Sequence, residues 1–150
     1  MIIPLCKRHL KKEDILIKKL IYILKLANNK KVEISFECDF QSKKILYLSK
    51  KVKNKFMVTF DTGNIFLIEK NLNASFKILR HLINHIHIKD RNKSKMNVVL
   101  GTGLINFKLF FRSLKKLKYK GDITLETNRG NDAIATGYQN LVFIKKLMDT

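Results

Sequence analysis

The chain has 150 residues, 45% of them hydrophobic, which is enough for one folded unit with a sizeable core. Its formal net charge of +19 invites a nucleic-acid partner, but the lysines are spread from Lys7 to Lys146 among many Asn and Ile residues, so a general compositional bias explains the charge better. Cys6 and Cys38 are too few for a disulfide framework or a thiolate zinc site, and they are typical of a protein of the reducing cytoplasm.

The first part of the chain alternates between strand and helix signals. The opening segment MIIPL looks like the end of a buried strand, with Pro4 near its terminus, and it is too short for a signal peptide. Apolar residues at helical spacing then predict a helix that ends at the pair Asn28-Asn29, and its interspersed lysines exclude a membrane span. We therefore expect no membrane partner. The next expected elements are a strand over residues 32–36, a helix over residues 41–52 and a strand over residues 56–60.

The same alternation continues to the end of the chain. The segment DTGN at residues 61–64 predicts a turn, and Asn106 is a plausible cap for a later helix. Strands that alternate with helices at this spacing predict parallel βαβ units in a single α/β domain over residues 1–150. The remaining expected elements are helices over about 72–82, 107–118 and 132–148, strands over 84–89 and 122–125, and a loop over 90–106 that contains GTG at residues 101–103.

Four candidate metal ligands share one position in this pattern, at or near the carboxyl end of a predicted strand. They are Glu37, Asp61, His87 and Glu126. In parallel α/β folds, ligands bind where the carboxyl ends of the strands converge. Three carboxylates and one imidazole suit one divalent cation, such as Mn²⁺, Mg²⁺, Co²⁺ or Zn²⁺. A single carboxylate at a strand end is usually a cap or a surface group, so the repeated placement is what predicts a metal site.

The strand that contains His87 carries further polar residues. His85 alternates with His87 and so shares its face of the strand, where we expect it to support the metal ligand rather than bind the metal directly. Lys89 and Arg91 are candidates for binding a phosphate or a carboxylate, and arginine is the better bidentate partner. They are equally compatible with two more exposed cations in a lysine-rich protein.

A resemblance to a known family rests on five segments in the order VEISFE, VTFDTGN, INHIHIKDR, LGTG followed by INF, and YKGDITLE. They resemble the C-terminal part of the xylose isomerase-like barrel superfamily, and within it the sugar phosphate isomerase/epimerase branch. The resemblance runs from about Met1 to the end of the chain. It implies an α/β fold that forms part of a (β/α)8 TIM barrel, from about the fourth strand to the eighth.

The resemblance also implies a function and a set of site residues. It implies an isomerase or epimerase that acts on a sugar or sugar phosphate with one divalent metal ion held by the four candidate ligands. Glu37 and Glu126 would in addition act as acid and base on a cis-enediolate. Arg91 lies close to where such enzymes place a substrate-binding arginine, and Asn64 and Lys89 are the other expected substrate contacts.

Two departures leave alternatives open. Endonuclease IV, a DNA-repair member of the superfamily, uses three zinc ions and needs a histidine three residues after the aspartate, where this chain has Asn64; no histidine follows His87. This favours one metal and a sugar over a nuclease or another nucleic-acid-binding protein. The chain also lacks the family's first three strands. It is therefore expected to be a fragment of a longer product, a half barrel that pairs with a second copy or a separate N-terminal half, or a noncatalytic remnant.

Overall fold

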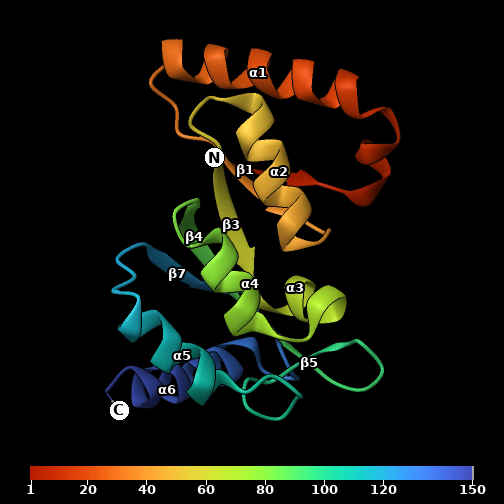
Figure 1. Cartoon of the computed structure of the whole chain (residues 1–150). Helices are drawn as coiled ribbons and strands as arrows, with labels where there is room; N and C mark the ends of the chain where they lie inside the picture. Colours follow the sequence, from red (N-terminus) through yellow and green to blue (C-terminus); the bar gives the residue numbers. More distant parts are fainter. Residues whose placement is uncertain (150) are drawn as a thin grey trace.

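The computed structural model describes residues 1–149, and its main feature is a five-stranded sheet with the strand order β1-β2-β3-β4-β7. All neighbouring strands in this sheet run parallel. In Figure 1 the strands lie side by side through the middle of the molecule, with α1 beyond one end of the sheet and α5 and α6 near the other. The strands are β1 (Ile2–Leu5), β2 (Ser35–Cys38), β3 (Met57–Asp61), β4 (Ile83–Ile88) and β7 (Asp122–Leu125).

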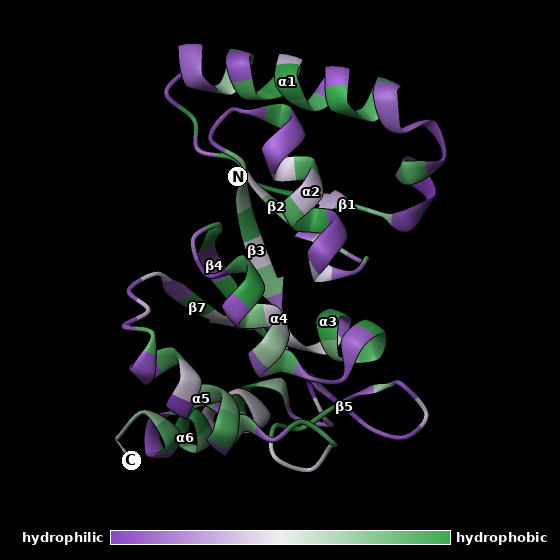
Figure 2. Cartoon of the chain, in the orientation of Figure 1, coloured by the Kyte–Doolittle hydropathy of each residue, from purple (hydrophilic) through white to green (hydrophobic). Residues whose placement is uncertain are grey.

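At least one helix follows each strand of this sheet, which confirms the predicted parallel α/β organisation. In Figure 2 the colour of α1 and α2 alternates between hydrophobic and hydrophilic along the helix, as expected for helices that bury one face. No helix among residues 1–149 is both long and apolar enough to cross a membrane. The helices are η1 (Lys7–Lys12), α1 (Glu13–Asn29), α2 (Ser42–Val52), α3 (Thr62–Glu69), α4 (Leu72–Leu79), α5 (Phe107–Lys116) and α6 (Ala133–Asp149).

The core lies between the sheet and the helices that cover one of its faces. Phe60 of β3 packs against Phe76 of α4 and Phe110 of α5, with ring centroids 5.6 and 5.8 Å away. Because side chains alternate along a strand, the residues between these core positions point to the opposite face of the sheet. That face is polar: Ser35 and Thr59 share a hydrogen bond of 2.7 Å, and His85 and Thr124 share one of 2.9 Å.

The register of the sheet brings the predicted ligands together at the carboxyl ends of the strands. Asp61 at the end of β3 lies directly beside His87 of β4. Leu125 of β7 pairs with Ile88 of β4, and the backbone N–H of Glu126 donates to the carbonyl of Ile88. Because all the strands are parallel, their carboxyl ends point the same way, and the side chains at those ends gather above one edge of the sheet.

Several local elements differ from the sequence expectations. Residues 62–64 begin helix α3 rather than form a turn, because the side chain of Asp61, the last residue of β3, accepts a hydrogen bond from the Asn64 backbone N–H and caps the helix. The opening strand β1 is not the buried strand that was expected: it lies at one edge of the sheet and is mostly exposed, with Leu5 as its one buried residue. The expected loop 90–106 contains a short antiparallel hairpin, β5 (Asp90–Arg91) and β6 (Asn97–Val98).

Candidate metal centre

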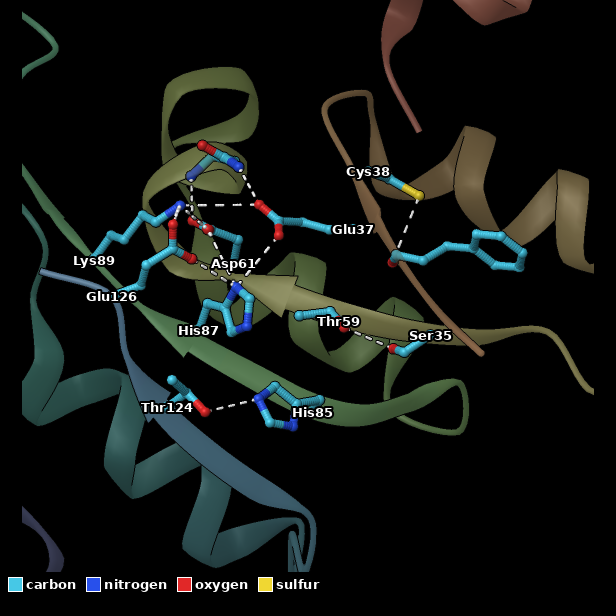
Figure 3. Close-up of polar contacts among 12 residues, drawn as sticks. Ser35, Glu37, Cys38, Thr59, Asp61, His85, His87, Lys89, Thr124 and Glu126 are labelled. Atoms are coloured by element: carbon cyan, nitrogen blue, oxygen red, sulfur yellow. Dashed lines mark hydrogen bonds and ion pairs between the residues drawn. The ribbon is translucent and has the colours of Figure 1, made fainter. Parts of the chain in front are cut away.

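The four predicted ligands meet at the carboxyl ends of four strands. Each offers one ligand atom, and these atoms all lie within 4.8 Å of one another. Glu37 comes from β2, Asp61 ends β3, His87 lies in β4 and Glu126 directly follows β7. Figure 3 shows the four side chains converging on one point from these different strands. The structure therefore brings together all four residues that the sequence pattern singled out, in a cluster that could hold a metal ion.

His87 Nδ1 lies at the centre of the carboxylates. It is 2.9 Å from Glu126 Oε2, 3.3 Å from Glu37 Oε2 and 4.0 Å from Asp61 Oδ2. Although Nδ1 is buried, it has no hydrogen-bond partner of good geometry among the described residues. Carboxylate oxygens surround this buried imidazole nitrogen without forming a well-directed hydrogen bond to it. One nitrogen and several carboxylate oxygens are a set of ligands that suits a divalent cation. The residues present therefore fit a bound metal ion.

The same contacts change the acid–base properties of His87 and Glu37. The Glu37 carboxylate raises the pKa of His87, against the opposing effect of burial. In return, His87 lowers the pKa of Glu37, and the nearby Lys89 adds to this effect. In the absence of a metal ion, the ring and the carboxylate thus stabilise each other in their charged forms.

The ammonium group of Lys89 lies beside the cluster and contacts two of its carboxylates. Its Nζ is 2.7 Å from Asp61 Oδ2 and 2.9 Å from Glu126 Oε1, and only 8% of its side chain is exposed. Although burial acts to lower it, these two carboxylates raise the pKa of Lys89. Glu126 therefore turns Oε2 toward His87 and Oε1 toward Lys89. With three carboxylates and one ammonium, the cluster keeps a negative charge when His87 is neutral, which suits a divalent cation.

The start of α3 holds Lys89 in place. Thr62 Oγ1 lies 2.8 Å from both the backbone N and the backbone O of Lys89, so it accepts from one and donates to the other. A Cβ on Gly63 would lie 2.8 Å from the Cβ of Lys89. The close approach of α3 to Lys89 therefore needs glycine at this position. Sequence reasoning missed both Thr62 and Gly63, and their only signal was the DTGN segment, which was interpreted as a turn.

Asn64 and Arg91, two of the predicted substrate contacts, form a chain that leads to Glu37. Asn64 Nδ2 donates to Glu37 Oε1 at 2.8 Å, and Arg91 Nη2 donates to Asn64 Oδ1 at 3.0 Å. Arg91 Nη1 donates to the carbonyl of Lys95 at 3.1 Å. Arg91 thus contacts the cluster through Asn64. Both of its Nη nitrogens donate hydrogen bonds to groups of the protein itself.

His85 lies on the same face as His87, farther from the carboxyl end of β4. Its Nε2 is 2.9 Å from Thr124 Oγ1, and its ring stands nearly perpendicular to that of His87 with the centroids 5.2 Å apart. Burial lowers the pKa of His85, and the neighbouring His87 adds to this effect. His85 contacts the ring of His87 from below and is not among the four clustered ligands, so its supporting role stays a prediction.

The GTG segment binds a carboxylate of the chain itself. Asp90 is fully buried, and its Oδ2 accepts from the backbone N–H of Gly101 at 3.0 Å and of Gly103 at 2.9 Å. A Cβ on Gly103 would overlap the Asp90 carboxylate. These backbone N–H groups therefore hold the loop that follows β4 against the strand end, next to Arg91.

The fold and the cluster together define part of an α/β barrel with a candidate metal centre at the carboxyl ends of its strands. The family model for the xylose isomerase-like TIM barrel matches residues 7–147, and the chain belongs to this family. The resemblance to the xylose isomerase-like superfamily that the sequence segments indicated is thereby confirmed. A search of curated proteins finds no match.

Three solved structures illustrate how far the similarity extends. A D-tagatose 3-epimerase-like protein superposes with a TM-score of 0.81 and 19% identity over 99% of this chain and 62% of that one. D-allulose 3-epimerase from Methylomonas sp. gives 0.75 and 20% over 87% of this chain and 54% of that one. A probable 3-DHS dehydratase from Bacillus anthracis gives 0.74 and 16% over 85% and 55%. The chain thus spans little more than half the length of these structures, and at such identities they establish its fold as a partial TIM barrel.

Proposed function

We propose that this chain carries the metal-binding and acid–base residues of a metal-dependent isomerase or epimerase that acts on a sugar or sugar phosphate. The observation that carries the proposal is the convergence of Glu37, Asp61 and Glu126 on the buried Nδ1 of His87, which has no hydrogen-bond partner of good geometry among residues 1–149. Membership of the xylose isomerase-like family supports it. So does its structural similarity to D-allulose 3-epimerase and L-ribulose 3-epimerase.

The four clustered residues would hold one divalent ion, Mn²⁺, Mg²⁺, Co²⁺ or Zn²⁺. When bound, this ion would supply Lewis acidity to a substrate carbonyl and its neighbouring hydroxyl. Lys89 would complement the ion from the side, because its ammonium already contacts Asp61 and Glu126. Lys89 and Asn64 are the proposed donors to substrate oxygens, because each nitrogen carries one more N–H than its contacts with the cluster use.

Glu37 and Glu126 are suited to move the substrate proton. They come from β2 and β7, on either side of the central pair β3 and β4. One carboxylate removes the proton from the carbon next to the carbonyl. The electron pair of that C–H bond forms a C=C bond while the carbonyl π pair moves onto its oxygen, which gives a cis-enediolate. Return of a proton to the same carbon from the other glutamate re-forms the carbonyl and gives the epimer; return to the former carbonyl carbon, with the neighbouring hydroxyl proton moving to the former carbonyl oxygen, gives the isomer.

Metal binding is the first test. Isothermal titration of the metal-free chain with Mn²⁺ should show one site, which His87→Ala and Glu126→Gln should abolish or weaken strongly. His81→Ala is the matched control, because His81 is exposed and lies away from the cluster. A native chain that binds no divalent ion would contradict the assignment of the site.

Proton exchange is the second test, because it detects the first chemical step without requiring full turnover. Ketoses and ketose phosphates are incubated with the chain and Mn²⁺ in D₂O, and loss of the proton next to the carbonyl is followed by NMR. We expect exchange that depends on the metal and disappears in Glu126→Gln. Metal binding without exchange of any of these sugars would contradict the acid–base roles while leaving the metal site in place.

A further inference from the structure

We propose that Arg91 is a positioning residue: acting through Asn64, it fixes which oxygen of Glu37 faces the metal centre. The proposal rests on the metal-dependent function proposed above. It also gives Arg91 a different task from the substrate contact expected from the sequence. The argument starts from Asn64, which lies between the two charged groups.

Both ends of the Asn64 amide are used, and this determines its orientation. Nδ2 donates to Glu37 Oε1 at 2.8 Å, and Oδ1 accepts from Arg91 Nη2 at 3.0 Å. If the amide were flipped, its carbonyl oxygen would face the Glu37 carboxylate and its NH₂ group would face the guanidinium, so two repulsive contacts would replace two hydrogen bonds. Arg91 therefore forces the donor end of Asn64 toward Glu37.

The contact with Asn64 gives the two carboxylate oxygens of Glu37 different surroundings. Oε1 accepts from Asn64 and lies 3.9 Å from Lys89 Nζ, whereas Oε2 lies 3.3 Å from His87 Nδ1. With Oε1 bound by the Asn64 donor and facing Lys89, Oε2 is the oxygen left for a cation at the centre of the cluster. The Arg91–Asn64 pair thus orients the carboxylate before any ion arrives.

The backbone of Arg91 is held by hydrogen bonds on both sides. Its backbone N–H donates to Asp90 Oδ1 at 2.8 Å, and its carbonyl accepts from the Leu104 N–H at 2.8 Å. Asp90 is in turn bound by the N–H groups of Gly101 and Gly103. The LGTG segment therefore provides a rigid base from which the guanidinium reaches Asn64.

The position of the guanidinium is unfavourable in two respects. It packs against the first turn of α3, where a Cβ on Gly63 would lie 2.9 Å from Arg91 Nε, and helix N-termini disfavour cations. Arg91 Nε is also buried without a hydrogen-bond partner among residues 1–149. Local stability alone does not account for an arginine in this place. Such locally unfavourable groups are expected at functional sites, and the Asn64 contact is what this one provides.

Glu126 is the glutamate of the cluster that no Asn–Arg pair orients. Half of its side chain is exposed, against 19% for Glu37. Within the described part of the chain its side-chain ion pairs are with Lys89 and His87, and its carboxylate accepts no hydrogen bond from an amide or a guanidinium. The two glutamates are therefore held differently: Glu37 is oriented in advance, and Glu126 is free to adjust to substrate.

The test is Mn²⁺ affinity of the full chain, measured by isothermal titration. Arg91→Met removes a positive charge near the cluster, so a purely electrostatic role predicts tighter cation binding. Positioning predicts the opposite, a loss of about 10- to 100-fold, the usual effect of losing a group that orients a metal ligand. Arg112→Met removes one charge from the exposed face of α5 and is the matched control, with unchanged affinity expected.

Two further variants keep the test decisive if Arg91→Met folds poorly by circular dichroism. Arg91→Lys keeps the charge but cannot serve both Asn64 and the Lys95 carbonyl, and Asn64→Leu removes the intermediate; both should lose affinity. The double variant Arg91→Lys/Asn64→Leu should bind Mn²⁺ as tightly as Asn64→Leu alone, because Arg91 acts on Glu37 through Asn64. Native affinity in the Arg91 variants overturns the positioning role and leaves the metal site standing. A native chain that binds no Mn²⁺ overturns both proposals.

Discussion

Asp61 and Lys89 form an ion pair in which both side chains are nearly buried: Nζ lies 2.7 Å from Oδ2, and the exposed fractions are 1% for Asp61 and 8% for Lys89. The pair results from the register of β3 and β4, which sets Asp61 beside His87 and therefore within reach of the residue two positions later. It places a permanent positive charge against the carboxylates that we propose as metal ligands.

Replacing this ammonium should have opposite effects on the metal-free and the metal-bound chain. Lys89→Met leaves the buried Asp61 carboxylate without a cation, and we expect unfolding in urea with a chelator present to cost about 3 kcal/mol less, the lower end for breaking a buried pair. Mn²⁺ should bind the more negative cluster more tightly and restore more stability than in the native chain.

Lys93→Met is the control for this experiment, because Lys93 lies in the exposed hairpin that follows β4. It should change neither quantity. Equal metal-free stability of Lys89→Met and the native chain would show that the ion pair has no energetic role.

The affinity for metal should rise with pH. A metal ion needs the neutral Nδ1 of His87, and the Glu37 carboxylate holds the pKa of His87 above its ordinary value of 6.5. A proton therefore competes with the metal at and above pH 6.5. Below the raised pKa, affinity should fall by up to about tenfold per pH unit, the limit for one competing proton. Titrations in a pH series test this, and an affinity independent of pH across that range would rule out His87 as a ligand.

The stability of the metal-free chain should vary with pH in the opposite sense over the same range. Because the folded pKa of His87 is raised, its contribution is complete below 6.5 and is lost as pH rises through the folded value. Because the folded pKa of Glu37 is lowered, its contribution is present above 4.5 and is lost as pH falls through the folded value. The joint contribution of these two groups should thus be highest between these limits, and His87→Ala should remove the decline in metal-free stability that begins above pH 6.5 in chelator-containing melts.

Gly63→Ala should disturb the site although alanine is the better helix former. The added Cβ would lie 2.8 Å from the Cβ of Lys89 and 2.9 Å from Arg91 Nε, so α3 and the end of β4 must separate. We expect a loss of about 1–3 kcal/mol, the usual cost of overpacking, together with weaker Mn²⁺ binding.

Gly137→Ala provides the comparison, because a Cβ there meets nothing within 4 Å. It should stabilise α6 by about 0.5–1 kcal/mol, the ordinary gain of alanine over glycine in a helix. Similar gains in both variants, measured by urea unfolding, would refute the close approach at Gly63.

Asp90→Asn should loosen the loop that carries Arg91. The amide nitrogen would face backbone N–H groups that now donate to a buried carboxylate, and we expect a loss of about 2–3 kcal/mol. Tryptic cleavage after Lys93 or Lys95 should become faster. Asp132→Asn is matched in chemistry but exposed, where Oδ1 accepts from the first turn of α6, and it should leave cleavage in the hairpin unchanged. Cleavage of Asp90→Asn at the native rate would contradict the anchoring role of Asp90.

The repeating order of strands and helices was readable from the sequence, because apolar spacing and strand ends are local properties. The same order predicted where Glu37, Asp61, His87 and Glu126 would lie, since parallel strands present their carboxyl ends together. The helix that starts at Thr62 was not predicted. Gly63 and Asn64 are typical of turns, and the capping bond from Asp61 becomes evident only when the strand end and the helix are in place.

Sequence alone determined the class of fold, the family and the four residues that cluster, because each of these depends on residue types and their order along the chain. Only the tertiary structure decided how the cluster is balanced: Lys89 lies against two carboxylates, and Arg91 turns toward Asn64 rather than toward an open site. These contacts join residues 27 or more positions apart, and strand register and the packing of α3 on β4 bring them together. No local spacing encodes distances of that kind.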